Sequence, residues 1–388
     1  MRILLLTGKG GVRKTTVAAA TAVRAARAGI RSVVCSTDPA HSLADVFDVP
    51  LGDAATEIIP GLDGVQLDAR VRLEQAWGSV REYLVALLDW AGAGTVEAEE
   101  LAVIPGLDEV FALADIKALA DSGRYELVVV DCAPTAETLR LLSLPDVLGW
   151  YMQRVFPAQR NVTRMVRPLL SRMVNMPVAG DQVFDAVRAF YTRLDGVREL
   201  LQDGAVTSAR LVVNPEAVVV AEARRTYTYL SLFGYHVDAV IANRLLPAAV
   251  TDAWFDEWRE LQVTQLQRIE AAFAPIPILT AELSASEPIG VERLDAFGVA
   301  LYGALTPEAR LCDLEPFRVE PVGDALVLSM HLPLVEKRDV ELGRHNGELL
   351  VAVGPHRRAV VLPDSLRHRQ VSGARLEGDR LVVDFVEV

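Results

Sequence analysis

The stretch Ile3–Thr16 reads ILLLTGKGGVRKTT and places four consecutive apolar residues directly before a glycine-rich turn that ends in lysine and two threonines. A continuous apolar run is typical of a strand that is buried on both faces of a parallel sheet. The turn nearly matches the phosphate-binding pattern G-x-x-x-x-G-K-S/T, but Arg13 stands where the pattern has its last glycine. The strand and the loop after it predict a site for a nucleotide.

The residues of this loop have separate expected roles. Glycines let the main chain approach the phosphates, and the backbone N–H groups at the start of the next helix point at them. We expect Lys14 to reach the terminal phosphates and the Thr15 hydroxyl to ligate Mg²⁺. A merely flexible turn is the alternative, and it does not account for a lysine and two threonines in register. The loop residues expected to bind nucleotide are Gly8, Lys9, Gly10, Gly11, Arg13, Lys14, Thr15 and Thr16.

Arg13 is the position at which the pattern is broken. A Cβ here approaches the place of the β-phosphate, and a left-handed backbone costs a residue other than glycine about 1 kcal/mol or more. Two outcomes stay open from the sequence. The arginine side chain either points outward or makes its own contact with a phosphate.

The rest of the N-terminal part predicts a doubly wound α/β domain over residues 1–305. Helix-favouring residues at Thr15–Ala28 end at Gly29, and the runs that follow predict short buried strands of a mostly parallel sheet. Two segments without strand signals, 72–121 and 150–202, have helical periodicity and predict a helical insert above the sheet. The expected strands are Ile3–Leu6, Arg31–Ser36, Leu127–Val130, Arg210–Val213, Ala239–Ala242 and Ile276–Leu279.

Residues 317–388 have a different pattern. Short runs alternate apolar and polar residues, and turn signals such as Asn346-Gly347 and Glu377-Gly378-Asp379 separate them. They predict a small all-β sandwich, which a linker near residues 306–316 joins to the first domain.

Composition narrows the class of protein. A formal net charge of −13 over 388 residues argues against general nucleic-acid binding. Cys35, Cys132 and Cys312 lie far apart and form no C-x-x-C, which excludes a disulfide framework and a cysteine-type zinc site. The sequence has no signal peptide and no apolar stretch of bilayer length, so we expect a cytoplasmic protein without a transmembrane segment.

Two acidic residues follow predicted strands. Asp38 stands in STDPAHSLADVF and Asp131 in VVVDCAPTAETLRLLSLPD, both at the carboxyl end of a parallel strand, where open α/β sheets hold ligands. Asp38 can orient an attacking water, and Asp131 can support Mg²⁺ through its water shell. An ordinary Asp-Pro turn and a helix cap are the alternatives.

These motifs together resemble the arsenical pump-driving ATPases and the guided-entry factors that target tail-anchored membrane proteins. The resemblance covers residues 1–305, with further matches at VVNPEAVVVAEARR, VIANRLLP and IPILTAELSASEPIG. It implies ATP as substrate, Mg²⁺ as cofactor and a homodimer. It also implies that Asp38 positions the hydrolytic water, that Asn243 reads adenine, and that Pro215 and Glu216 belong to a segment lining the nucleotide site. Lys9, directly after the first glycine, marks the variant loop whose lysine crosses to the other subunit's phosphates.

The chain departs from this family in several places. Besides Arg13, Ala136-Glu137 replaces the Gly-His common in the second switch segment, and the zinc-binding C-x-x-C is missing, so we expect no zinc. The three cysteines do not match those of the arsenite-responsive members, which argues against an arsenite pump. The C-terminal segment resembles the α-crystallin (small heat-shock) domain of one bacterial and plastid branch.

The second helical segment contains four of the six methionines and five arginines without an acidic residue between Trp150 and Pro177. A methionine-rich apolar stripe adapts to varied partners, although a helical core is the alternative. The Trp254 and Trp258 pair, at i and i+4, is interpreted as helix packing. The candidate residues for binding a hydrophobic client are Met152, Met165, Leu169, Met173 and Met176.

The leading hypothesis is a dimeric, Mg²⁺- and ATP-dependent switch ATPase, with Asp38, Lys9 and Lys14 as catalytic residues and Thr15 and Asp131 at the metal. It couples nucleotide state to a hydrophobic client or a membrane protein. The alternative is a non-hydrolysing descendant that acts as a binding or chaperone-like protein because Arg13 blocks the loop. A partition ATPase with the same loop is a third hypothesis, which the acidic net charge of the chain disfavours.

Overall fold

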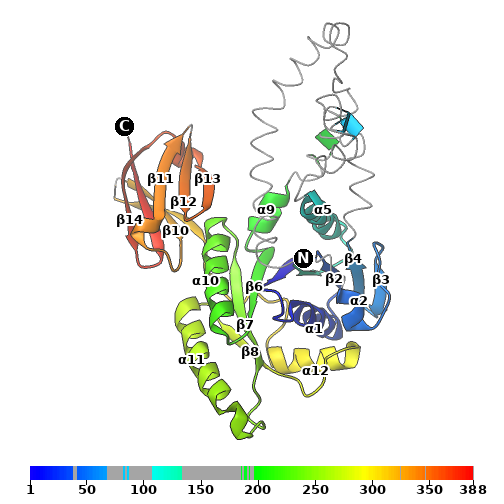
Figure 1. Cartoon of the computed structure of the whole chain (residues 1–388). Helices are drawn as coiled ribbons and strands as arrows, with labels where there is room; N and C mark the ends of the chain where they lie inside the picture. The colour runs from blue at the N-terminus through cyan, green and yellow to red at the C-terminus, as the bar shows by residue number, and fades with distance from the viewer. Residues whose placement is uncertain are drawn as a thin grey trace.

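The computed structural model in Figure 1 describes residues 1–37, 42–67, 107–132 and 196–387, except 324 and 346, together with a few isolated residues between 82 and 192. Asp38 and most of residues 133–195 lie outside the described residues. The predictions that rest on Ala136-Glu137 and on the client-binding candidates therefore stay predictions.

An eight-stranded sheet forms the first domain, in the order β3-β4-β2-β5-β1-β6-β7-β8. Every neighbouring pair is parallel except β3 with β4. β1 lies between β5 and β6, with Leu4 opposite Val129 and Ser208, so the loop after β1 emerges in the middle of the carboxyl edge. The strands are β1 Arg2–Thr7, β2 Ser32–Ser36, β3 Thr56–Ile59, β4 Leu62–Gln66, β5 Leu127–Asp131, β6 Thr207–Val213, β7 Val237–Leu245 and β8 Ile278–Glu282.

The predicted doubly wound α/β class is confirmed, and each predicted strand has its counterpart. The β3–β4 hairpin was not predicted. The helices of this domain are α1 Lys14–Arg27, α2 Ser42–Phe47, α5 Leu107–Asp121, α9 Val197–Gln202, α10 Ala217–Leu232, α11 Asp256–Phe273 and α12 Val291–Tyr302.

α1 is held between the sheet and α12. Ten of its fourteen residues are buried, because alanines let the helix lie close to its neighbours on several sides. At Gly298 of α12 a Cβ would come within 2.9 Å of the Ala20 carbonyl oxygen, so glycine permits the close approach of the two helices. Thr21 Oγ1 and Tyr302 Oη share a buried hydrogen bond of 2.8 Å at the same contact. These contacts therefore hold the N-terminus of α1 in a fixed position relative to the sheet.

Two described helices belong to the predicted helical insert. α5 ends the segment 72–121 and places Phe111 and Ile116 in the core of the domain. α9 ends the segment 150–202 and buries Val197 and Leu201 in the same core. The remainder of both segments, including the predicted layer above the sheet, lies almost entirely outside the described residues.

The C-terminal domain is the predicted β-sandwich. One sheet has the order β14-β15-β10-β9 and the other β11-β12-β13, both antiparallel. Gly323, Gly347 and Gly378 have positive φ at the predicted turns, a conformation that glycine adopts without strain. The strands are β9 Phe317–Val322, β10 Ala325–His331, β11 Val340–His345, β12 Glu348–Val353, β13 His356–Val361, β14 Gln370–Glu377 and β15 Arg380–Val386, with the short helix α13 Asp364–Arg367.

The sandwich packs against α10 (Figure 1). Leu232, at the end of α10, is fully buried among the core residues of the sandwich. Tyr227 Oη and His331 Nε2 are 2.7 Å apart, and the Thr228 hydroxyl donates to the Pro333 carbonyl at 2.7 Å. Arg358 lies over the Phe317 ring at 4.5 Å, beside the end of the helix. The two domains therefore share a packed interface on one helix.

A buried cation fixes the linker to the sheet. Arg210 of β6 is fully buried and its Nε donates to Asp238 Oδ1 at 3.0 Å. The same guanidinium donates to the carbonyls of Pro307 and Ala309 at 2.7 and 2.8 Å. A buried charge needs such satisfied partners, so the start of the linker follows a fixed path.

Candidate functional site

The loop between β1 and α1 lies against the end of β6. A Cβ at Gly8 would come within 2.2 Å of the Val212 carbonyl oxygen, whereas at Gly10 and Gly11 a Cβ would meet nothing within 4 Å. Gly8 is thus required by the close approach of two backbones, and Gly11 by its φ of 85°. Gly10 and Gly11 thus have open space beside the main chain, which the approach of a phosphate requires.

Arg13 adopts the left-handed conformation expected of the missing glycine, with φ 64° and ψ 46° as the N-cap of α1. Its side chain extends to Glu287, where a guanidinium nitrogen lies 3.5 Å from a carboxylate oxygen. The guanidinium thus pairs with a carboxylate of the segment after β8, while the predicted contact with a phosphate stays a prediction.

Lys14 and the threonines begin α1. Lys14 is 6% exposed, and its Nζ donates to the Lys9 carbonyl at 3.3 Å across the loop. An ammonium has three N–H donors, so this contact positions the group and uses one of them. Thr16 is buried and Thr15 is half-buried. The lysine and Thr15 thus stand at the helix N-terminus, where an anion is favoured by the helix dipole.

An acidic side chain ends the neighbouring strand. Asp131 is 1% exposed at the end of β5, and the Ser36 hydroxyl donates to its Oδ2 at 3.3 Å. The Cys132 N–H donates to the Leu6 carbonyl at 3.0 Å, which ties this strand end to the start of the loop. The structure thereby brings Asp131 to the same edge as Lys14 and Thr15. Asp38, the other predicted acid, lies outside the described residues.

The thiols beside this acid are buried. Cys35 and Cys132 are 0% and 3% exposed. Burial raises the pKa of both thiols, and the charge of Asp131 raises it further. Both therefore stay protonated at neutral pH and act as small apolar core residues.

The end of β7 is tied to the phosphate loop. Asn243 is 2% exposed, its Nδ2 donates to the Val12 carbonyl at 2.9 Å, and its Oδ1 accepts from the Arg244 N–H at 2.9 Å. In this structure the amide thus contacts the loop, and its predicted role in reading adenine stays a prediction. On the other side of the loop, Lys9 Nζ lies 3.7 Å from Glu222 of α10.

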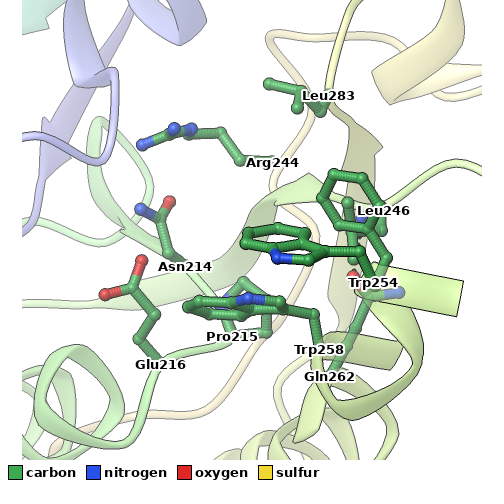
Figure 2. Close-up of a pocket in the computed structure, with 10 residues that line it drawn as sticks. Asn214, Pro215, Glu216, Arg244, Leu246, Trp254, Trp258, Gln262 and Leu283 are labelled. Carbon is green, nitrogen blue, oxygen red and sulfur yellow. Dashed lines mark hydrogen bonds between the residues drawn. The ribbon is translucent and has the colours of Figure 1, made fainter. Parts of the chain in front are cut away.

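A pocket of about 280 Å³ opens beside these residues, over the ends of β6, β7 and β8. Pro215 and Glu216, both predicted to line the nucleotide site, are among its walls. Figure 2 shows the indole rings of Trp254 and Trp258 one above the other beside Pro215. The lining residues are Asn214, Pro215, Glu216, Arg244, Leu246, Trp254, Phe255, Trp258, Gln262 and Leu283.

The interpretation of Trp254 and Trp258 as helix packing was wrong. Trp254 is 71% exposed and Trp258 47% exposed, and both face the pocket. Trp254 lies in the 3-10 turn Ala253–Phe255 and Trp258 in α11, and the i, i+4 spacing does not say whether the two side chains meet the core or solvent. A useful signal was the acidic residues around them, Asp252, Asp256 and Glu257, which mark an exposed surface.

Comparison with known proteins agrees with this geometry. Residues 1–303 match the family described as anion-transporting ATPase, over the whole of the sheet domain that carries the loop. The chain belongs to this family. Residues 323–385 match the HSP20-like domain found in members of the anion-transporting ATPase family, which corresponds to the C-terminal sandwich.

Two relatives match the chain over both of its domains. A putative arsenical pump-driving ATPase 1 of Aquifex aeolicus is 34% identical over 393 residues, which cover 99% of each chain. A putative arsenical pump-driving ATPase of Chlorobaculum tepidum is 37% identical over 388 residues, covering 99% of this chain and 96% of the relative. An ATPase get3 of Sclerotinia sclerotiorum is 29% identical over 322 residues, covering 80% and 92%. Among the described residues, no helix has the length and apolarity to cross a bilayer.

Proposed function

We propose that this member of the family is an ATP- and Mg²⁺-dependent homodimeric switch, in which hydrolysis of ATP to ADP and phosphate is coupled to binding of a hydrophobic client or membrane-protein segment. The observation that carries the proposal is the path of the phosphate loop. Arg13 holds the left-handed backbone of a glycine and its side chain pairs with Glu287, which supports a loop that still accepts phosphate.

In the proposed reaction each group at the sheet edge has one task. Lys14 and the N–H groups of the loop bind the terminal phosphates and stabilise the charge that develops on them. Asp38 orients the attacking water in line with the bond to be broken. A divalent cation would neutralise phosphate charge when bound with the nucleotide. The Thr15 hydroxyl and, through water, the Asp131 carboxylate are the hard oxygen ligands that Mg²⁺ prefers.

The dimeric part of the proposal concerns Lys9. Its ammonium lies 3.7 Å from Glu222 in the same chain, and the two side chains are 37% and 28% exposed. A pair this exposed is weak, on the order of 0–1 kcal/mol, so it does not prevent Lys9 from reaching the phosphates of a second subunit. Release of Glu222 of α10 then accompanies closure of the dimer. The client would bind the methionine-rich segment between Trp150 and Pro177.

Equilibrium binding of ATP·Mg²⁺ to the purified chain tests the proposal, with phosphate release as the second readout. We expect binding and slow turnover, loss of both in Lys14→Ala, and loss of turnover alone in Asp38→Asn. Arg27→Ala is the control for Arg13→Gly, because it also removes an arginine–glutamate pair, to Glu292, but one on the outside of α1.

One result favours the alternative function. If the wild-type chain binds no ATP and Arg13→Gly restores binding, the arginine blocks the loop and the protein is a non-hydrolysing binding protein. If neither chain binds ATP, the switch mechanism is refuted. DNA-dependent stimulation of turnover would instead support a partition ATPase.

A further inference from the structure

The pocket beside the phosphate loop has an aromatic wall and a polar wall. Trp254 and Trp258 form the first, although large apolar side chains at 71% and 47% exposure gain little by facing water. Figure 2 shows both indoles extending from the α11 side toward Asn214 and Glu216, with Arg244 across the space from them. A flat π-surface opposite polar groups suits a planar, partly polar ligand.

Asn214 provides an independent indication of a ligand. It is 5% exposed, and within the part of the chain that the structure describes its Oδ1 has no hydrogen-bond partner. Buried polar atoms are nearly always paired, so an acceptor left over on a pocket wall indicates a donor that binds there. An amino group of a base or a hydroxyl of a ribose supplies such a donor.

The location relates the pocket to the phosphate loop. The loop follows β1, and the pocket covers the ends of β6, β7 and β8, which are the next strands in the sheet. Two strand spacings of about 4.8 Å separate the end of β1 from the end of β7, roughly 10 Å. This is the scale of an extended nucleotide from its diphosphate to its base. Asn243 joins the two places directly, since its amide contacts Val12 and its neighbour Arg244 lines the pocket.

We propose that Trp254 and Trp258 form a stacking platform for the base of the nucleotide whose phosphates bind at Gly8–Thr15. Asn214 Oδ1 accepts a hydrogen bond from the same nucleoside, and the Arg244 guanidinium closes the opposite side. The inference rests on the proposed function, because it takes the nucleotide as given and assigns the residues that hold its base. It also gives the exposure of the two indoles a reason.

Calorimetric titration of the full chain with ADP·Mg²⁺ and, separately, with pyrophosphate·Mg²⁺ tests this platform, because pyrophosphate lacks the base. The double variant Trp254→Ala/Trp258→Ala is expected to bind ADP about tenfold more weakly or worse, the usual effect of removing a base-stacking aromatic residue. Its affinity for pyrophosphate stays unchanged. Trp254→Phe/Trp258→Phe keeps an aromatic face and retains most of the affinity, and Asn214→Leu weakens only ADP. Val263→Ala, an exposed residue of α11 outside the pocket, is the matched control.

The possible outcomes are distinct. Unchanged ADP affinity in the double alanine variant overturns the platform and leaves the phosphate site intact. Absence of ADP and pyrophosphate binding in the wild type overturns both this inference and the proposed function. If the double variant changes the oligomeric state in sedimentation but not the affinity for ADP, the two indoles are a contact between copies of the chain, and the assignment of a base is refuted.

Discussion

Replacing Arg13 by glycine or by alanine tests the effect of the loop's backbone conformation separately from the effect of the arginine side chain. Arginine or alanine at φ 64° costs about 1–2 kcal/mol relative to glycine, which adopts this conformation freely. Glycine in turn makes the unfolded chain more flexible, which lowers the free energy of unfolding by about 0.4–1 kcal/mol. The ion pair to Glu287 is lost in both variants and cancels between them. Arg13→Gly should therefore be more stable than Arg13→Ala by about 0.8 kcal/mol.

Thermal unfolding of the nucleotide-free chain at fixed pH measures this difference. For a domain of this size about 0.8 kcal/mol corresponds to roughly 2 °C in Tm. Gly10→Ala is the control, since at Gly10 a Cβ meets nothing and φ is not in the left-handed region. There alanine is expected to be the more stable residue by about 0.4–1 kcal/mol. If alanine is also more stable than glycine at position 13, the left-handed conformation of Arg13 is incorrect and so is the argument for an open cradle.

Three further changes test other parts of the structure. Gly8→Ala brings a Cβ to 2.2 Å from the Val212 carbonyl, so chemical denaturation should show a loss of about 3 kcal/mol or more, together with loss of ATP binding. Arg210→Met leaves the Asp238 carboxylate buried without its main partner and should cost about 3–5 kcal/mol, which Arg210→Met/Asp238→Asn partly recovers in the same assay. Burial lowers the pKa of His331 from 6.5 to about 4, so the unfolded chain takes up a proton first as the pH falls. Stability of the sandwich should drop by about 2 kcal/mol from pH 7 to pH 5 and do so much less in His331→Gln.

The sequence was most informative where one local pattern determines the structure. The run Ile3–Leu6 is apolar on both faces and predicts a central strand, and the glycines at 323, 347 and 378 predict the turns of the sandwich. The β3–β4 hairpin was missed because Leu62–Gln66 contains an aspartate and a glycine and does not resemble a buried run. β4 nevertheless pairs with β2, and its Leu62 and Val65 are buried.

The site was only partly predictable for the same physical reason. The spacing of Gly8, Lys14 and Thr15 identifies a phosphate loop, because the chemistry lies within one turn of chain. Arg13 pairs with Glu287, which is far away in sequence and lies in the segment between β8 and α12, the helix that packs on α1. The pocket could not be predicted from the sequence for a similar reason. Its walls come from three strand ends, the 3-10 turn Ala253–Phe255 and α11, and no single segment carries its pattern.

Leu232 belongs to the first domain by its position in the chain, but it is buried in the hydrophobic core of the sandwich. The boundary between the domains along the chain therefore differs from the boundary between their hydrophobic cores. A protein shortened at the linker would expose Leu232 to water, together with the surface at Gly234 against which the Phe317 ring packs. The two halves would then have to be produced together to stay in solution. In the intact chain, we therefore expect the sandwich to move together with α10 whenever that helix tilts.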